Sequence, residues 1–242
     1  MSNKEPLITL SVVSHNQYDL MSLLLADLDK VYNGDFELII TMNIVDHHRP
    51  LPRSYIKKII VNSEPRGFGA NHNTAFKFAT TPYFAVINPD IRLSELDCVA
   101  FLQPFANTSV GVVVPKVISP NGAIEDSVRY RPTFIRLLRR VVFRDRQLDY
   151  RWGDIPFPVE WAAGMFMVFT RSVFEKVGGF DDKKYFMYFE DVDICRRIWK
   201  SGWSVIANPS VTVVHAAQRA SKRSIKHLRW HVSSAIRYLT NI

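Results

Sequence analysis

The sequence predicts an α/β protein with a Rossmann-like, mostly parallel sheet flanked by helices and a helical segment at the C-terminal end. Three observations predict this class. Apolar, β-branched segments alternate with segments of helical periodicity through the first 120 residues, the pattern of parallel strands joined by crossover helices. The early apolar segments end in polar residues, where strands of such sheets carry their ligands. Residues 218–242 again show helical spacing.

Strands are expected where apolar residues run nearly without interruption. In the first half these segments are 7–15, 36–43, 56–63, 82–90 and 110–119. Helices are expected where apolar residues recur every three or four positions, at 18–32, 69–80 and 94–105. Ser94 and Asp97 stand three residues apart at the start of the last of these, as capping residues do.

The second half has a different texture. A basic, partly amphipathic stretch at 127–152 predicts a helix or a helical pair, and 159–171 predicts a strand around small residues. A short helix is expected at 172–182, ended by the adjacent glycines 178 and 179. The remaining segments predict a helix from Glu190, a strand at 203–215 broken at Pro209, and a helix at 224–239.

Composition limits the class of protein. A chain of 242 residues with 47% hydrophobic and 22% charged residues is typical of one large soluble domain. Cys98 and Cys195 have neither metal-site nor secreted-disulfide spacing, which favours a reducing compartment. The start lacks a signal-peptide core, and the apolar run at 161–169 is short for a membrane span. We therefore expect a cytoplasmic protein.

Two basic segments stand on a mildly acidic body. Residues 129–151 contain eight arginines and two aspartates, and residues 219–237 contain six cations and no acid. Such segments favour partners that carry phosphates, namely nucleic acid, anionic lipid or a phosphorylated substrate. The stretch 134–143 alternates apolar and arginine positions as an interfacial helix does, although a solvated basic face is the alternative. Because the arginines match no nucleic-acid motif, we expect no nucleic acid partner.

Polar residues at the predicted strand ends are expected to gather at one rim of the sheet. They are His15, Asn16, Asn43, Asn62, Asn88 and Asp90. Asp90 follows Asn-Pro at the end of a buried strand, where an oxygen ligand suits Mg²⁺ or Mn²⁺ bridging a pyrophosphate. An Asx-Pro turn is the alternative. His215, at the end of the last strand, becomes a metal ligand only if it lies near Asp90.

Gly67 and Gly69 precede a predicted helix, where backbone N–H groups can approach an anion. The spacing is neither a complete dinucleotide fingerprint nor a P-loop, so a tight turn is the competing interpretation. The neighbouring Arg66, Asn71 and Asn73 favour a ligand-binding loop.

Three acids stand within four residues at the start of the helix from Glu190. The helix dipole favours acids there and accounts for Glu190 and Asp193. Asp193 faces Arg196 and Arg197 and predicts an outward ion pair. Asp191 instead has Ile194 and Cys195 as its helical neighbours, so it lies over the inward side. A partly desolvated carboxylate is what a general base needs.

The ordered motifs resemble family 2 inverting glycosyltransferases. They are "SVVSHN", "RGFGANHN", "INPD", "WAAGMFMV", "VGGFDDKKYFMYFEDVDICRR", "SGW" and "VVHAA". The resemblance implies a GT-A fold, a nucleotide-sugar donor and a divalent cation, Mg²⁺ or Mn²⁺. "SVRYRP", "YFMYFEDVDIC" and "RWHVSSAIRYL" are most similar to bacterial O-antigen rhamnosyltransferases.

That likeness implies transfer of L-rhamnose from dTDP-rhamnose, with UDP- or GDP-sugars as other donors, in O-antigen or cell-surface polysaccharide synthesis. The acceptor is expected to be an undecaprenyl-diphosphate-linked or other glycan. The protein is expected to lie peripherally on the inner face of the cell membrane, with its Arg-rich segments against anionic lipid. We expect one GT-A domain over 1–217, with a nucleotide-sugar half at 1–120, an acceptor half at 121–217, and a basic helix at 218–242.

The resemblance also implies roles for individual residues. Asp191 matches the family's catalytic base, with Glu190 beside it, and Asp90 matches the last acid of the Asp-x-Asp metal motif, whose first position is Asn88 here. Donor-binding candidates are His15, Asn16, Asn43, Arg66, Gly67, Gly69, Asn73, Asn88 and Asp90. Acceptor-binding candidates are Trp161, Ala163, Gly164 and Tyr188, and metal candidates are Asp90 and His215.

Asn43 and Asn88 depart from the family pattern, because many members carry a base-contacting Asp at the first position and a metal-binding Asp at the second. An inactive sugar-nucleotide-binding subunit is therefore the main alternative. A nucleic-acid-binding protein is a weaker one. A nucleotidyltransferase is disfavoured, because "SHNQYD" stands where a Gly-rich, Lys-containing loop would follow the first strand.

Overall fold

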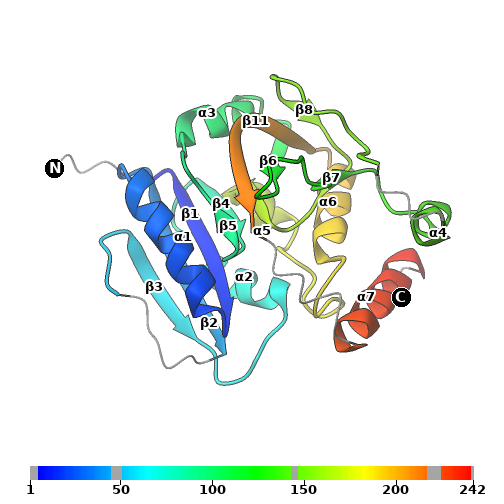
Figure 1. The fold of residues 1–242 in the computed structure, drawn as a ribbon, viewed down its shortest axis with the longest axis horizontal. Helices are drawn as coiled ribbons and strands as arrows, with labels where there is room; N and C mark the ends of the chain where they lie inside the picture. Colours follow the sequence, from blue (N-terminus) through cyan, green and yellow to red (C-terminus); the bar gives the residue numbers. More distant parts are fainter. Residues whose placement is uncertain (1–4, 45–50, 143–146, 217–224, 241–242) are drawn as a thin grey trace.

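A computed structural model of the chain describes residues 5–44, 51–142, 147–216 and 225–240, with a large sheet at its centre (Figure 1). The strands of that sheet are β1 (Ile8–His15), β2 (Phe36–Ile44), β3 (Ile56–Val61), β4 (Tyr83–Ile87), β5 (Ile91–Arg92), β6 (Val110–Ile118), β8 (Phe157–Pro158), β10 (Phe166–Thr170) and β11 (Ser204–His215). A small separate sheet pairs β7 (Val128–Arg129) with β9 (Trp161–Ala162).

The helices have the following bounds. They are α1 (Tyr18–Val31), α2 (Phe68–Phe76), α3 (Cys98–Leu102), α4 (Phe134–Val142), α5 (Arg171–Lys176), α6 (Glu190–Lys200), α7 (Ile225–Thr240) and the 3-10 turn η1 (Gln103–Ala106). None of the described helices is both long and apolar enough to cross a membrane.

The large sheet is mostly parallel, as the sequence predicts. Its order is β3-β2-β1-β4-β10-β6-β11-β5, with β8 paired to β11 beside that path. β3, β2, β1 and β4 run parallel to one another, and so do β6 and β11. β10 is antiparallel to both β4 and β6 and separates them. The expected strand at 159–171 is therefore two strands in two sheets, separated by a turn at Gly164 and Met165.

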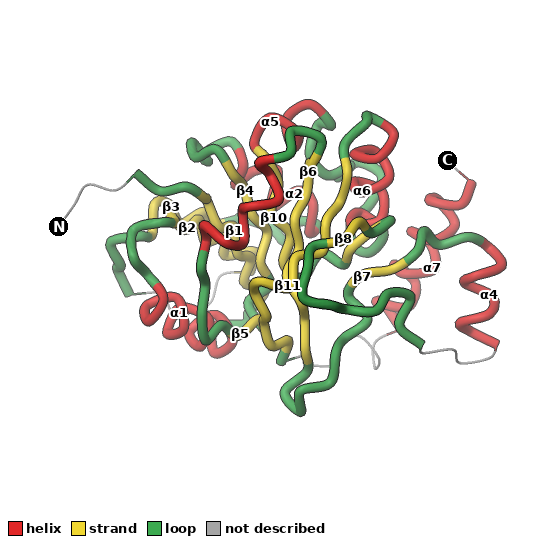
Figure 2. The backbone as a smooth tube through the Cα atoms, turned by 90° about the horizontal axis from the view of Figure 1, so that it is seen from above, coloured by secondary structure: helices red, strands yellow, loops and turns green. Residues whose placement is uncertain are grey.

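Helices cover both faces of the sheet, with α1 on one side and α5 and α6 on the other (Figure 2). Alternation along β1 explains the two layers, because successive strand residues point to opposite faces. Leu10 and Val12 pack with Leu24 of α1 in one apolar cluster. Ser11, between them, points to the other face, where its hydroxyl lies 2.9 Å from Nδ1 of the buried His72 in α2.

Two predicted elements differ in detail from the structure. The helix expected at 94–105 begins four residues late, because Asp97 and not Ser94 is its cap and accepts the Ala100 N–H at 3.0 Å. It tightens into η1 where Pro104 stands. The strand expected at 203–215 is one continuous strand, β11, and in place of a break at Pro209 its pairing with β6 shifts register between Asn208 and Thr212.

The two basic segments meet at one end of the molecule. In both views α4 and α7 lie beyond α6 from the sheet (Figures 1 and 2). The described part of 127–152 contains one helix, α4, and not a helical pair, while 143–146 lie outside the described residues. The expected basic helix at 218–242 is described over 225–240, and the cations at 219, 222 and 223 also lie outside the described residues.

Candidate active site

Polar side chains at the ends of β1 and β2 form a hydrogen-bonded cluster. Asn43 Nδ2 lies 3.1 Å from His15 Nδ1 and donates to the Arg66 carbonyl at 2.9 Å. Asn43 Oδ1 accepts from Asn62 Nδ2 and from the Arg66 N–H, each at 2.8 Å. Asn62 Nδ2 also donates to Asn71 at 2.7 Å. All four bonding positions of the Asn43 amide are therefore used within the chain, and they fix the loop before α2.

The other rim residues lie at the turns that follow β1 and β4. Asn16 has a left-handed backbone with φ 57°, a conformation that asparagine tolerates better than most residues. The Asn88 N–H donates to the Met165 carbonyl at 2.9 Å, and its carbonyl accepts from Ile91 at 3.2 Å. This tight turn holds Asp90 at the rim, so the turn alternative and the ligand hypothesis are compatible.

Asp90 and His215 meet, which is the condition that the sequence set for His215. Nε2 of His215 lies 3.2 Å from Oδ2 of Asp90, and its Nδ1 lies 2.8 Å from Oε2 of Glu125. Burial lowers the pKa of His215, but hydrogen bonds to the two carboxylates outweigh it and raise the pKa to about 9. Asp90 Oδ1 is buried without a hydrogen-bond partner among the described residues.

The glycine loop before α2 is shaped by close contact with the second half of the chain. A Cβ on Gly67 would lie 2.4 Å from the Phe186 carbonyl oxygen, and one on Gly69 would lie 2.6 Å from Cβ of Phe180. The Phe68 N–H donates to the same Phe186 carbonyl at 3.0 Å. Both glycines therefore serve backbone packing here, in addition to any role toward an anion.

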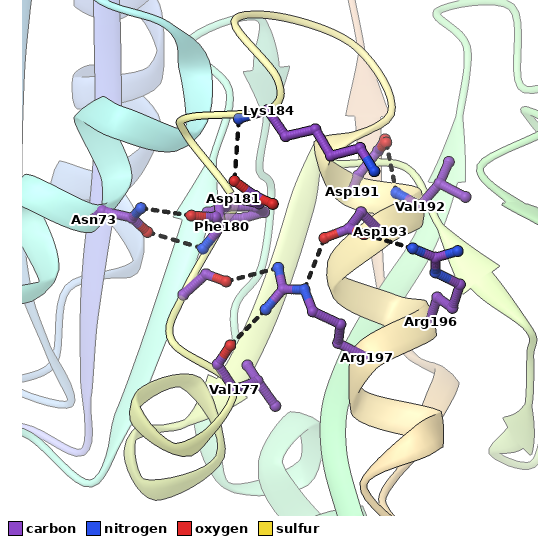
Figure 3. A network of polar contacts seen from close by, with 11 residues as sticks. Asn73, Val177, Phe180, Asp181, Lys184, Asp191, Val192, Asp193, Arg196 and Arg197 are labelled. Carbon is purple, nitrogen blue, oxygen red and sulfur yellow. Dashed lines mark hydrogen bonds and ion pairs between the residues drawn. The ribbon is translucent and has the colours of Figure 1, made fainter. Parts of the chain in front are cut away.

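Asn73 of α2 is joined to the same region. Its Nδ2 donates to the Phe180 carbonyl at 2.8 Å, and its Oδ1 accepts the Phe180 N–H at 2.9 Å (Figure 3). The same Nδ2 also donates to Asp182 at 3.2 Å. The Asn73 amide thus holds the Gly-Gly-Phe-Asp loop. Arg66, by contrast, is exposed, and its side chain donates to Thr74 at 3.0 Å.

The three acids at the start of α6 have three different environments. Asp191 Oδ2 accepts the Gly164 N–H at 3.1 Å, and its Oδ1 accepts the Val192 N–H at 2.8 Å. Burial raises the pKa of Asp191, while these N–H groups and the charge of Arg129 oppose the rise. Burial, and then the charge of Asp191, hold the pKa of Glu190 well above its usual range. Glu190 Oε2 has no hydrogen-bond partner among the described residues.

Asp193 differs from the prediction in one respect. Its ion pairs with Arg196 at 3.2 Å and Arg197 at 2.7 Å are confirmed (Figure 3). The prediction that this pair faces outward is wrong, because Asp193 is buried. Arg197 also donates to the carbonyls of Val177 and Gly179, so the cluster ties α6 to the glycine turn after α5.

The loop before α6 carries backbone strain. Tyr188 and Phe189 both have left-handed backbones, with φ of 70° and 68°, which costs on the order of 1–3 kcal/mol for each such residue. Helix α7 contacts this loop along its length. Tyr188 Oη lies 2.8 Å from His227 Nδ1, and Ser234 donates to the Met187 carbonyl at 2.9 Å. These contacts with α7 stabilise the strained backbone of the loop.

A pocket of about 940 Å³ opens beside these acids. Glu190, Asp191, Glu125 and His215 lie on its wall. The predicted acceptor residues Trp161, Ala163 and Tyr188 also line it. Gly164 reaches the site through its hydrogen bond to Asp191.

The pocket includes residues that the sequence did not single out. Arg129, Glu125 and His231 line it, from β7, the segment after β6, and α7. Glu125 follows an Asn-Gly turn at 121–122, and that turn signal could have predicted a return of the chain to the end of β6. No local signal marks His231, because its place depends on how α7 docks.

Known proteins that are similar to this chain are glycosyltransferases. A family model described as "Glycosyltransferase like family 2" matches residues 24–233. N-acetylglucosaminyl-diphospho-decaprenol L-rhamnosyltransferase of Mycobacterium tuberculosis is 31% identical over 172 residues, covering 64% of this chain and 54% of the relative. This chain thus spans about half the length of that relative. Rhamnosyltransferase WbbL of Escherichia coli K12 is 25% identical over 252 residues, covering 96% of this chain and 92% of WbbL.

Solved structures support the fold. GalNAc-T7, in a crystal structure with UDP, GalNAc and Mn²⁺, superposes with a TM-score of 0.65 at 12% identity, covering 90% of this chain and 45% of that one. At such low identity the likeness concerns the fold alone, and it agrees with the mostly parallel sheet described above. Since the family model matches well over half of its length, the chain belongs to glycosyltransferase family 2 and has a GT-A type fold.

Proposed function

We propose that this chain is an inverting glycosyltransferase that moves L-rhamnose from dTDP-rhamnose to a lipid-linked glycan acceptor in O-antigen or cell-surface polysaccharide synthesis. The observation that carries the proposal is the placement of Asp191, with a raised pKa, on the wall of a pocket beside the sheet rim. The choice of sugar is supported by the relatives, two of which are named as rhamnosyltransferases.

The proposed reaction is a single displacement at the anomeric carbon of the donor sugar. An acceptor hydroxyl oxygen forms the new bond to that carbon as the bond to the nucleoside diphosphate breaks. Asp191 takes the hydroxyl proton. General-base catalysis of this kind typically raises the rate by about 10²–10⁴-fold. The raised pKa of Asp191 is closer to pH 7 than that of an ordinary aspartate, which makes its carboxylate a stronger base. Attack from the face opposite the leaving group inverts the configuration.

Asp90 and His215 are proposed to hold a divalent cation, Mg²⁺ or Mn²⁺. The orphaned, buried Asp90 Oδ1 supplies one oxygen ligand, and the adjacent His215 Nε2 supplies one nitrogen ligand once the cation displaces its proton. Glu125 on His215 Nδ1 has the orienting position that carboxylates take behind metal-bound histidines. Among the described residues no three His, Cys, Asp or Glu side chains form a metal cage. Asp90 and His215 would therefore hold the cation with the help of ligands from outside the chain, and the cation would offset the charge of the leaving group.

The donor nucleotide is proposed to lie along the rim, over the loop that Asn43 fixes. The backbone N–H groups that open α2 and the exposed Arg66 favour its diphosphate. Asn43 stands where many family members carry an aspartate. Because its amide is engaged with His15, Asn62 and Arg66, this difference changes the shape of the nucleobase site. UDP- and GDP-sugars are the other donors to test.

The protein is proposed to work in the cytoplasm, peripherally on the inner face of the membrane. Helices α4 and α7 carry cations and no acidic residues, and each cation near an anionic surface contributes on the order of 1 kcal/mol. Flotation with liposomes tests this. Binding to vesicles with anionic lipid at low salt, weakened at high salt, is expected, whereas no binding in any condition would reject it.

A thermal-shift panel tests the donor proposal. Nucleotides and nucleotide sugars are added with and without Mn²⁺ or Mg²⁺, because a ligand that binds only the folded state raises its apparent stability. We expect the largest shift for dTDP-rhamnose with a cation, followed by product formation when a GlcNAc-diphosphate lipid is added. A shift with no product under any acceptor would favour the alternative of an inactive sugar-nucleotide-binding subunit, which Asn88 in place of an acid supports.

A further inference from the structure

The pocket beside Asp191 changes chemically along its length. Carboxylates line it near the sheet, where Glu125, Glu190 and Asp191 stand. Arginines line it toward α4, where Arg136 and Arg139 stand. In both views α6 lies between the sheet and α4, so the arginines come from an element farther from the sheet than the carboxylates do (Figures 1 and 2). The arginine end is used by neither the proposed base nor the proposed cation site.

Arg136 is held in place while keeping donors available. Its guanidinium lies over the Tyr130 ring at 4.9 Å and donates to the Arg131 carbonyl at 3.0 Å. Its carboxylate neighbour among the described residues, Glu160, is 3.8 Å away and only partly buried, which makes a weak pair. A guanidinium has five N–H donors, so one carbonyl contact leaves most of them for a ligand.

Arg139 lies one helical turn further along α4 and lines the same pocket. Residues three apart on a helix are neighbours on its surface. Two guanidinium groups on successive turns suit two linked phosphates, since each can form paired bonds to phosphate oxygens. Arg129 also lines the pocket, and its Nη2 pairs with Asp126 at 3.0 Å.

Apolar side chains surround this end of the pocket on the outside. On α4, Phe134, Ile135 and Leu138 are 69%, 71% and 51% exposed, although Leu137 between them lines the pocket. On α7, Leu228, Val232 and Ile236 form an exposed stripe at four-residue spacing, while His231 of the same helix lines the pocket. Each helix therefore has one face in the pocket and one apolar face outside.

We propose that the pocket binds the diphosphate of a polyprenyl-diphosphate-linked acceptor on Arg136 and Arg139. The acceptor sugar then reaches Asp191, and the prenyl chain leaves over the exposed apolar residues of α4 and α7 toward the bilayer. The inference rests on the proposed function and assigns its acceptor subsite. The donor diphosphate belongs to the other end, near Asp90 and His215.

The test uses the full chain and three acceptor probes. They are GlcNAc-diphosphate and GlcNAc-monophosphate carrying the same short prenyl chain, and an octyl GlcNAc with no phosphate. The variants are Arg136→Gln, Arg139→Gln and both together, with Lys77→Gln on the exposed end of α2 as the matched control. Binding is followed by tryptophan fluorescence without donor, so that the result does not require turnover.

For the wild type we expect tighter binding of the diphosphate probe than of the other two. Each single variant is expected to weaken that binding about tenfold, as losing a charge-assisted contact does, and the double variant more, with octyl GlcNAc unaffected. Lys77→Gln should bind as wild type. Equal binding of all three probes by the wild type, or unchanged diphosphate binding by the double variant, would refute the subsite.

The same variants separate this subsite from the proposed function. If dTDP-rhamnose turnover with octyl GlcNAc persists in the wild type while the probes bind alike, the subsite is wrong and the transferase stands. If the diphosphate probe binds through the arginines but no nucleotide sugar binds, the transferase proposal is wrong and the lipid site stands.

Discussion

Tyr188 Oη and His227 Nδ1 lie 2.8 Å apart, and this hydrogen bond joins the strained loop before α6 to helix α7. Phe186 and Phe189 of the loop also contact α7, through Trp230 at 4.9 Å and Tyr238 at 5.6 Å between ring centroids. The loop leads directly into Glu190 and Asp191. Helix α7 thus stabilises the conformation that sets the direction of the proposed base.

From this link we expect His227→Ala to lower kcat several-fold, because the strained loop relaxes once a contact is lost. Binding of the donor nucleotide, at the other end of the site, should stay the same. Leu228→Ala, on the exposed face of α7, is the matched control and should keep kcat on a water-soluble acceptor. Hydrogen exchange in residues 184–190 should rise in the first variant only, and equal exchange in both would contradict the link.

Asp191→Asn is expected to reduce kcat about 10²–10⁴-fold while donor affinity stays within twofold. Asp193→Asn, two residues on, should behave differently. It removes the buried partner of Arg196 and Arg197 and is expected to lower the free energy of unfolding by about 3 kcal/mol. Turnover with saturating donor and chemical denaturation measure the two effects. Near-normal turnover by Asp191→Asn would mean that another group is the base.

The acid limb of the rate profile tests the same residue. A base works only when deprotonated, so kcat falls as pH drops through its pKa. Because burial raises the pKa of Asp191, the fall is expected at a higher pH than an ordinary aspartate would give. Measuring kcat from pH 4 to pH 8 checks this. A profile flat down to the usual aspartate range would show that Asp191 is not desolvated during turnover.

Metal binding gives a prediction for the rim. His215→Ala and Asp90→Ala are each expected to abolish the extra thermal shift that Mn²⁺ gives to the dTDP complex. Glu125→Gln should weaken it less, by about 10–100-fold in apparent metal affinity, since Glu125 orients His215 and is not itself a proposed ligand. An equal response of all three variants would instead make Glu125 a direct ligand.

His72 should make the fold sensitive to acid. Burial lowers its pKa to about 3, against about 6.5 in the unfolded chain, so below pH 6.5 the unfolded state binds the extra proton. Stability therefore falls as pH drops, and His72 contributes a loss of about 2 kcal/mol between pH 7 and pH 5. The difference in urea unfolding between these two pH values should shrink in His72→Gln. If it does not, other groups cause the acid sensitivity.

The fold was largely predictable because its strands are almost continuously apolar and its helices are periodic. β1, β2 and β6 lie within one or two residues of their predicted ranges. The partners of β10 could not be predicted, because periodicity says that a segment is extended but not between which strands it inserts. The short β5, β7, β8 and β9 are two residues long, and so short a segment leaves no pattern.

The candidate site was predictable where a residue's own helix or strand decides its direction. Helical phase separates Asp191 from Asp193, but it does not predict the burial of Asp193, which depends on Arg197 being held by the carbonyls of Val177 and Gly179. His215 beside Asp90 depended on β5 pairing with the end of β11, which the sequence left as a condition. Arg136, Arg139 and His231 join the site only through the docking of α4 and α7.

The position of β10 has a consequence for synthesis on the ribosome. β4 and β6 are complete by residue 118, but the strand that joins them ends at Thr170. At about 5–20 residues per second, the nascent chain carries unpaired edges of β4 and β6 for roughly 3–10 s before β10 emerges. During that interval the first half of the chain is a natural client for chaperones, and a truncation near residue 120 is expected to aggregate and not to yield an isolated nucleotide-binding unit.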